Sequence, residues 1–385
     1  MYLITKLILI VFIIRPYNYN LWPLVGIWEG FAQLNPGYIE KGSVIFQNGG
    51  YDGQFFYLIT KYLSDTNLST PVLDAFHLRF HRIGLSLAMF PFVKIFGFHY
   101  YPLLLAILLT MTHIAGFYFL RTLCETGKKH YALFHLFSPF SLNSDLLLVA
   151  DAFMASFLLF ALFLLHRSGA FSDTKTVDLP LLAFSTMAFT FSIFIKEGAL
   201  FMLLPFCAYF LLKRKWLICC LFVFPLLTYF LFTRYAATIQ GVNLGTNPLS
   251  FSQLIDYPFW GLVKSFDVPA DFKGLVRELV KIPLLAYFVF LISLSGKIKS
   301  LRDGILYTPI LFTILQVTIA EEGYWRSFDN LSRMFAMSLP YSIFLYSSDD
   351  DFRFKGVLST GLFISLLLVL RIIAIKSQML YRIHF

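Results

Sequence analysis

Long apolar runs separated by short polar connections make up most of the sequence. Two connections are much longer than the others, and they cover residues 15–99 and 236–281. A helix needs about 20 mostly apolar residues to cross a bilayer. The pattern therefore predicts an all-α, polytopic transmembrane protein in which residues 1–385 form one domain with about eleven spans. The expected spans are residues 1–14, 100–120, 131–142, 146–165, 181–195, 198–212, 216–235, 282–295, 305–320, 331–346 and 357–375.

The run at residues 83–98 is apolar, but Pro91 and Lys94 interrupt it. If this run crossed the membrane, the basic connection that follows residue 120 would lie on the same side as the first long loop. Short loops rich in Lys and Arg remain in the cytoplasm. The sequence therefore predicts that residues 83–98 form an interfacial helix within the first extracytoplasmic loop.

Basic residues are distributed unevenly between the two sides of the expected bundle. The short outer turns hold only Lys196 and Arg326. This bias places the amino terminus inside, with residues 1–14 as a retained helix, and both long loops outside. The basic residues of the short cytoplasmic connections are Arg121, Lys128, Lys129, Arg167, Lys175, Lys213, Arg214, Lys215, Lys297, Lys299, Arg302, Arg353 and Lys355.

Composition agrees with a membrane protein, since 58% of the residues are hydrophobic, 14% are charged, and the mean hydropathy is +0.71. The formal net charge of +9 does not indicate a nucleic-acid partner, because no run of Lys and Arg is longer than residues 213–215. Membrane lipids are the expected partners of these basic residues. The four cysteines have neither the spacing of a disulfide framework nor that of a metal site.

The densest group of polar residues is the run NGGYDGQFFY at residues 48–57. Glycine adopts turn conformations that other residues avoid, and it adds no side chain that would block a ligand. Asp52, which lies between Tyr51 and Gly53, is therefore the leading candidate for catalysis. An ordinary turn is the alternative, because Asn-Gly and Asp-Gly sequences favour turns.

The run YDGQFFY resembles the Tyr-Asp-Gly-Gln-Phe-Tyr motif of bacterial polytopic membrane proteins that are similar to GT-C glycosyltransferases. The resemblance implies an enzyme of the bacterial inner membrane with a GT-C-like fold. Such an enzyme transfers a sugar from a polyprenyl-phosphate donor to a hydroxyl of a glycan, lipid or protein acceptor, on the extracytoplasmic face. Asp52 is then the general base that deprotonates the acceptor hydroxyl.

The resemblance extends, by matches of one or two residues, to the segment with Asp74 and Arg82, to the pair Lys196-Glu197, and to Arg333. Arg presents a bidentate fork to phosphate, so these cations are expected to hold the donor phosphate as it leaves. The candidate substrate-binding residues are Tyr51, Gln54, Arg79, Arg82, Lys196, Glu197, Arg326 and Arg333.

A metal site is the other interpretation of the segment near residue 80. On one helix, Asp74, His77 and His81 would share a face, as three metal ligands can. Leu78 stands where the zinc-protease pattern has Glu, so a phosphate contact by the neighbouring arginines is favoured. The resemblance leaves a divalent metal open without requiring one, and the sequence indicates no cofactor.

Two further functions remain as alternatives. A transporter or flippase is expected to carry charges in the middle of its helices and two related halves. Only Asp151 and Arg371 are prominent charges within the expected spans, and no halves repeat. A noncatalytic membrane scaffold of the same fold is the third alternative, because the usual acidic pair of GT-C first loops is not evident here.

Overall fold

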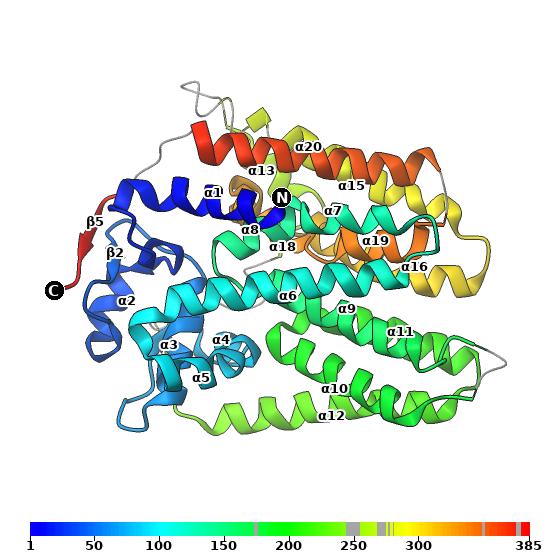
Figure 1. Ribbon diagram of the computed structural model, residues 1–385, viewed down its shortest axis with the longest axis horizontal. Coiled ribbons are helices and arrows are strands. Elements are labelled where there is room, and N and C mark those ends of the chain that lie inside the picture. The colour runs from blue at the N-terminus through cyan, green and yellow to red at the C-terminus, as the bar shows by residue number, and fades with distance from the viewer. Residues whose placement is uncertain are drawn as a thin grey trace.

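The computed structural model describes residues 1–172, 176–243, 255–267, 275, 278–279, 281–348, 351–374 and 379–385. Within these residues the chain is almost entirely helical, and most of the long helices run along the longest axis of the molecule (Figure 1). Lys175, which was assigned to a cytoplasmic connection, lies outside the described residues, as does much of the second long loop.

Three helices in the described part of the chain are long and apolar enough to cross a membrane: Phe98–Leu123, Trp216–Thr238 and Phe352–Ala374. They correspond to α6 (Tyr101–Leu123, preceded by the 3-10 turn η4, Phe98–Tyr100), α12 (Trp216–Thr238) and α20 (Phe352–Ala374). Large apolar side chains of α12, such as Leu217, Phe224 and Leu231, are exposed. These features indicate a membrane protein.

Shorter helices fill the space between the long ones. Helix α9 packs against α6 and α10, α11 packs against α16, and α15 packs against α20. Their apolar faces form one continuous core. The bounds of these helices are α1 Tyr2–Ile14, α9 Asp151–Arg167, α10 Leu179–Ile195, α11 Leu200–Leu212, α15 Lys281–Ser293 and α16 Leu301–Thr318.

Two of the expected spans are not continuous helices. Residues 131–142 are divided among η5 (Lys129–Ala132), α7 (Leu133–Leu136) and α8 (Pro139–Leu146). The break comes at Pro139, which has no N–H to continue a helix, while the side chain of Ser138 caps the new one. Residues 331–346 are likewise divided between α18 (Phe328–Met334) and α19 (Ser338–Tyr346), and Pro340 lies in the first turn of α19.

The first long loop folds into short elements at one end of the molecule (Figure 1). Strand β2 pairs in parallel with β1 and antiparallel with β5, so the end of the chain joins this loop. Helix α5 contains Pro91 and corresponds to the helix expected at residues 83–98. The elements are η1 Arg15–Tyr17, η2 Trp22–Leu24, β1 Ile27–Trp28, α2 Glu29–Leu34, η3 Pro36–Tyr38, β2 Val44–Phe46, α3 Gly53–Ser64, β3 Val72–Leu73, α4 Phe76–Phe80, α5 Gly84–Phe96 and β5 Tyr381–Ile383.

The remaining described elements connect the helices. Strand β4 (Val242–Asn243) pairs in parallel with β3, and it ties the start of the second long loop to the first. Helices α13 (Trp260–Ser265) and α17 (Glu322–Arg326) pack against each other. The 3-10 turns η6 (Glu197–Ala199) and η8 (Leu294–Lys297) flank α11 and α15.

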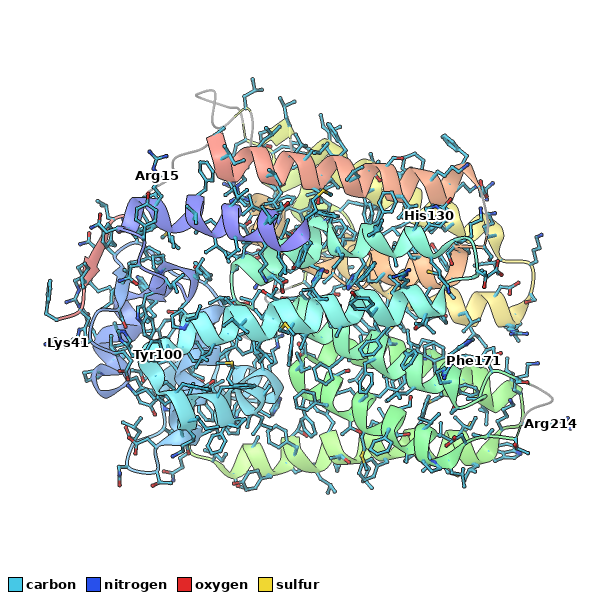
Figure 2. All side chains as sticks on the ribbon, viewed as in Figure 1. Arg15, Lys41, Tyr100, His130, Phe171 and Arg214 are labelled. Atoms are coloured by element: carbon cyan, nitrogen blue, oxygen red, sulfur yellow. The ribbon has the colours of Figure 1, made fainter. Side chains whose placement is uncertain are left out.

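Residues assigned to opposite sides of the membrane lie at opposite ends of the molecule. Figure 2 shows Arg15, Lys41 and Tyr100 at one end, and His130, Phe171 and Arg214 at the other. The long axis therefore coincides with the direction in which the sequence predicts that the helices cross the bilayer.

Candidate functional site

Asp52 lies at the N-terminus of α3, where glycines on both sides allow close backbone packing. A β-carbon at Gly50 would lie 2.2 Å from the carbonyl oxygen of Gly26, and one at Gly53 would lie 2.7 Å from that of Val25. Both distances are too short for a real β-carbon. Gly50 and Gly53 are therefore required for packing against residues 25–26, independently of any ligand near Asp52.

Tyr51 and Gln54 hold the same turn in place. The hydroxyl of Tyr51 donates to the carbonyl oxygen of Pro23, and Oε1 of Gln54 accepts from the backbone N–H of Trp28 at 3.0 Å. Gln54 is buried. Both candidate residues thus form hydrogen bonds with backbone groups of residues 23 and 28. These bonds stabilise the turn that carries Asp52.

Asp52 does not cap α3 with its side chain but pairs with two arginines from distant elements. Nη1 of Arg333, in α18, donates to Oδ2 of Asp52 at 2.9 Å, and Nη1 of Arg79, in α4, lies 3.3 Å from Oδ1. Arg79 also makes a bidentate contact with Asp74, at 2.9 and 2.6 Å, and its guanidinium lies 4.2 Å from the ring centre of Phe55. The carboxylate of Asp52 is therefore held between two guanidinium groups.

Arg82, Glu197, Lys196 and Asp151 form a second set of ion pairs. Arg82 makes a bidentate contact with Glu197, with Nε 2.9 Å from Oε2, and Lys196 donates to Asp151 at the start of α9. A β-carbon at Gly84 would lie 2.6 Å from the backbone nitrogen of Ile195, so the start of α5 packs directly on the end of α10. This close approach brings Arg82 to Glu197.

The electrostatics of the two sets are coupled. Burial alone would raise the pKa of Asp52, but the positive charges of Arg79 and Arg333, with smaller contributions from Arg82 and Lys196, hold that pKa well below its ordinary value. Burial likewise opposes ionisation of Glu197, yet Arg82 lowers the pKa of Glu197 to about 2. Both carboxylates are therefore ionised at neutral pH.

We call these eight side chains the charged site. Within it four cations face four carboxylates, so the site carries no net charge. An arriving anion must consequently compete with a carboxylate for its cation. The members of the charged site are Asp52, Asp74, Asp151, Glu197, Arg79, Arg82, Lys196 and Arg333.

Two features of the charged site point to a further ligand contact. Nε of Arg333 is buried and has no hydrogen-bond partner among the described residues. Tyr324, from α17, lies close enough that its pKa, which burial raises, also responds to the charges of Arg82 and Asp52. The sequence indicates Asp74 only as a possible metal ligand and Asp151 only as a charge within a span. Tyr324 is not indicated except by its position two residues before Arg326.

Arg326 lies apart from the charged site. Its guanidinium pairs with Glu322 and Asp267, and its side chain is 43% exposed. The proposed triad of Asp74, His77 and His81 does not form a metal site either, because Asp74 is bonded to Arg79. The part of the chain that the structure describes contains no group of three or more potential metal ligands.

No family model, curated protein or solved structure matches this chain. The charged site and the run at residues 51–57 are therefore the features of the molecule that bear on its function.

Proposed function

We propose that the chain is a GT-C-like membrane glycosyltransferase with about eleven spans. It moves a sugar from a polyprenyl-phosphate donor to an acceptor hydroxyl on the extracytoplasmic face of a bacterial inner membrane. The observation that carries the proposal is the position of Asp52 between Arg79 and Arg333. One potential base and several phosphate-binding cations thus lie in one site, at the end of the bundle that holds the first long loop.

The donor phosphate binds to guanidinium groups of this site. A phosphate presents several anionic oxygens to the forked guanidinium of Arg333, whose Nε is without a partner among the described residues. Asp52 is already paired with Arg333 and Arg79. A phosphate that binds to the same guanidinium groups neutralises part of the positive charge that stabilises the Asp52 carboxylate. The pKa of Asp52 then rises towards its ordinary value, and the carboxylate becomes a better base.

The reaction forms one bond and breaks another. Asp52 accepts the proton of the acceptor hydroxyl while the acceptor oxygen attacks the anomeric carbon of the sugar. The bond between that carbon and the phosphate oxygen breaks, and the lipid phosphate leaves with the bonding electron pair. Arg79, Arg82, Lys196 and Arg333 stabilise the charge that develops on this phosphate. Attack from the opposite face inverts the anomeric configuration.

A transporter or flippase is the second candidate, because one observation favours it. Lys6 and Asp145 form an ion pair inside the bundle, and both side chains are almost fully buried. Buried charges of this kind mark ion and substrate pathways in membrane proteins. A noncatalytic scaffold remains the third candidate, since ion pairs alone can hold a fold together.

Purified protein in lipid nanodiscs, supplied with labelled polyprenyl-phosphate sugars and a mixture of acceptors, distinguishes the three functions. We expect label in an acceptor product, and a loss of about a hundredfold or more in Asp52→Asn. Asp256→Asn is the matched control, because Asp256 pairs with Lys264 outside the charged site. Binding of donor without turnover would support the scaffold, and movement of donor across vesicle membranes without product would support the flippase.

A further inference from the structure

A second cluster of buried polar residues lies inside the helical bundle, and its members are distinct from those of the charged site. It consists of Lys6 of α1, His113 of α6, His135 of α7 and Asp145 of α8, each of which is at most 2% exposed. His113 is near the middle of α6, one of the three helices that are long enough to span a membrane. Polar and ionisable groups at such a position are costly, and they usually have a function.

All described contacts of the Asp145 carboxylate converge on one of its oxygens. Nζ of Lys6 donates to Oδ2 at 3.1 Å, and the hydroxyl of Tyr2 donates to the same atom at 3.2 Å. Nδ1 of His113 lies 3.4 Å from that oxygen as well, but it makes no hydrogen bond to it or to any other described residue. The other oxygen, Oδ1, is buried and has no hydrogen-bond partner among the described residues.

The second nitrogen of His113 determines where the protons of this ring lie. Nε2 is 3.1 Å from the carbonyl oxygen of His135. A carbonyl oxygen can only accept, so Nε2 carries a proton. A neutral imidazole has a single N–H, and its Nδ1 would therefore present a lone pair to the carboxylate of Asp145. Two acceptors at this distance repel each other unless a proton lies between them.

We propose that His113 and Asp145 share an exchangeable proton, so that the interior of the bundle contains a proton-binding site. The proton forms an N–H bond with Nδ1 or an O–H bond with Oδ2, and the other of these two atoms lies 3.4 Å away. It comes from bulk water as hydronium and returns to water on release. With the ammonium group of Lys6, the loaded cluster carries one net positive charge, and the unloaded cluster is neutral.

His135 is a second buried histidine directly beside His113. Its ring stacks on that of His113, with centres 4.6 Å apart and planes inclined by 4°. Both ring nitrogens of His135 are buried and have no partner among the described residues. A β-carbon at position 116 would lie 3.0 Å from Nε2 of His135, so Gly116 provides the space for this ring.

The surroundings of the cluster supply few other titratable groups. Helix α1 contributes Tyr2 and Lys6, and helix α9 contributes the neutral hydroxyl of Ser156 near Gly116. Helix α20 packs against this region with the apolar Leu368, and its Arg371 is paired with Asp329 of α18, which also packs against α8. Lys6 is therefore the charge that most strongly opposes proton binding at His113.

Nuclear magnetic resonance of protein with ¹⁵N-labelled histidine in lipid nanodiscs tests this proposal, because nitrogen shifts report which ring nitrogens carry protons. His113→Gln identifies the signals. We expect Nδ1 of His113 to gain a proton as the pH falls from about 9 to about 4. Lys6→Met removes the opposing charge, and it should raise the midpoint by about one pH unit or more. Lys264→Met, which alters an exposed lysine outside the cluster, should leave the midpoint unchanged.

A purely structural cluster gives a different result. His113 would then remain in one neutral form, with a proton on Nε2 alone, across the whole pH range. That result in the unmodified protein would overturn the proposal, and this measurement does not depend on whether Lys6→Met folds. A midpoint that does not move in a folded Lys6→Met variant would overturn it as well.

Discussion

Arg333 and Asp52 are separated by 281 positions in the sequence, and the guanidinium of Arg333 donates to the carboxylate of Asp52 at 2.9 Å. The contact joins α18, late in the chain, to the residue that directly precedes α3. It also restrains the candidate base, because a carboxylate paired with two guanidinium groups binds a proton weakly. Any anion that binds at Arg333 therefore alters the basicity of Asp52.

Replacing Arg333 tests whether it binds the donor phosphate. Arg333→Gln removes the charge and the forked donor, so we expect donor affinity to fall by about tenfold or more. Isothermal titration with a polyprenyl phosphate in nanodiscs measures the effect. Arg326→Gln is the matched control, because Arg326 is also paired with carboxylates but lies outside the charged site. Equal losses in the two variants would contradict a specific role for Arg333.

The arginine pairing also predicts how stability depends on pH. The pKa of Glu197 is lowered from 4.5 to about 2, so its contribution to stability is complete above pH 4.5 and is lost as the pH falls towards 2. We expect the unfolding temperature to change little between pH 7 and about 5 and then to decrease. In Glu197→Gln this decrease should be smaller.

Glu125→Gln, on the exposed connection after α6, is the control for that measurement. It should follow the pH profile of the parent protein. A Glu197→Gln profile as steep as that of the parent would mean that the pair of Glu197 with Arg82 contributes no stability in this pH range.

Most members of the charged site are residues that the sequence places together, but the sequence does not indicate which acid pairs with which cation. Asp52, Arg79, Arg82, Lys196 and Arg333 were all expected on one side of the membrane, because basic residues in short loops report sidedness. Which acid pairs with which cation depends on tertiary packing, such as the contact of Gly84 with the end of α10. Helical periodicity and loop length are local features of the sequence, and they do not determine contacts between distant segments.

Helix breaks and interior polar groups were harder to predict. Hydropathy averages over a window, and it did not register that Pro139 ends one short helix and begins another. Lys6 lies within the first apolar run, and Asp145 lies in the short connection between the expected spans at residues 131–142 and 146–165. The structure buries both of them together, because each supplies the counter-charge that the other needs away from water.

The orientation in the membrane can be tested by labelling single cysteines in a variant that lacks the four native ones. Lys41 and His130 are exposed and lie at opposite ends of the molecule (Figure 2). We expect Lys41→Cys to react with an impermeant reagent added outside the cell, and His130→Cys to react only after permeabilisation. Reaction of both from one side would contradict the orientation and, with it, an extracytoplasmic transferase.

The packing of the turn that carries Asp52 gives a final prediction, which separates the role of glycine in the fold from its role near a ligand. In Gly53→Ala the new methyl group would meet the carbonyl oxygens of Val25, at 2.7 Å, and Leu147, at 3.1 Å. The first turn of α3 must then shift, and we expect a loss of about 1–3 kcal/mol in the free energy of unfolding. Because Asp52 directly precedes this turn, its contacts with Arg79 and Arg333 should lengthen and donor binding should weaken.

Gly304→Ala is the control variant. The nearest atom to the new methyl group is 3.6 Å away and the position is inside helix α16, so stability should increase by about 0.5–1 kcal/mol. Thermal unfolding and donor titration on both variants measure the two effects, and a Gly53→Ala protein as stable as its parent would show that the turn tolerates the added methyl group.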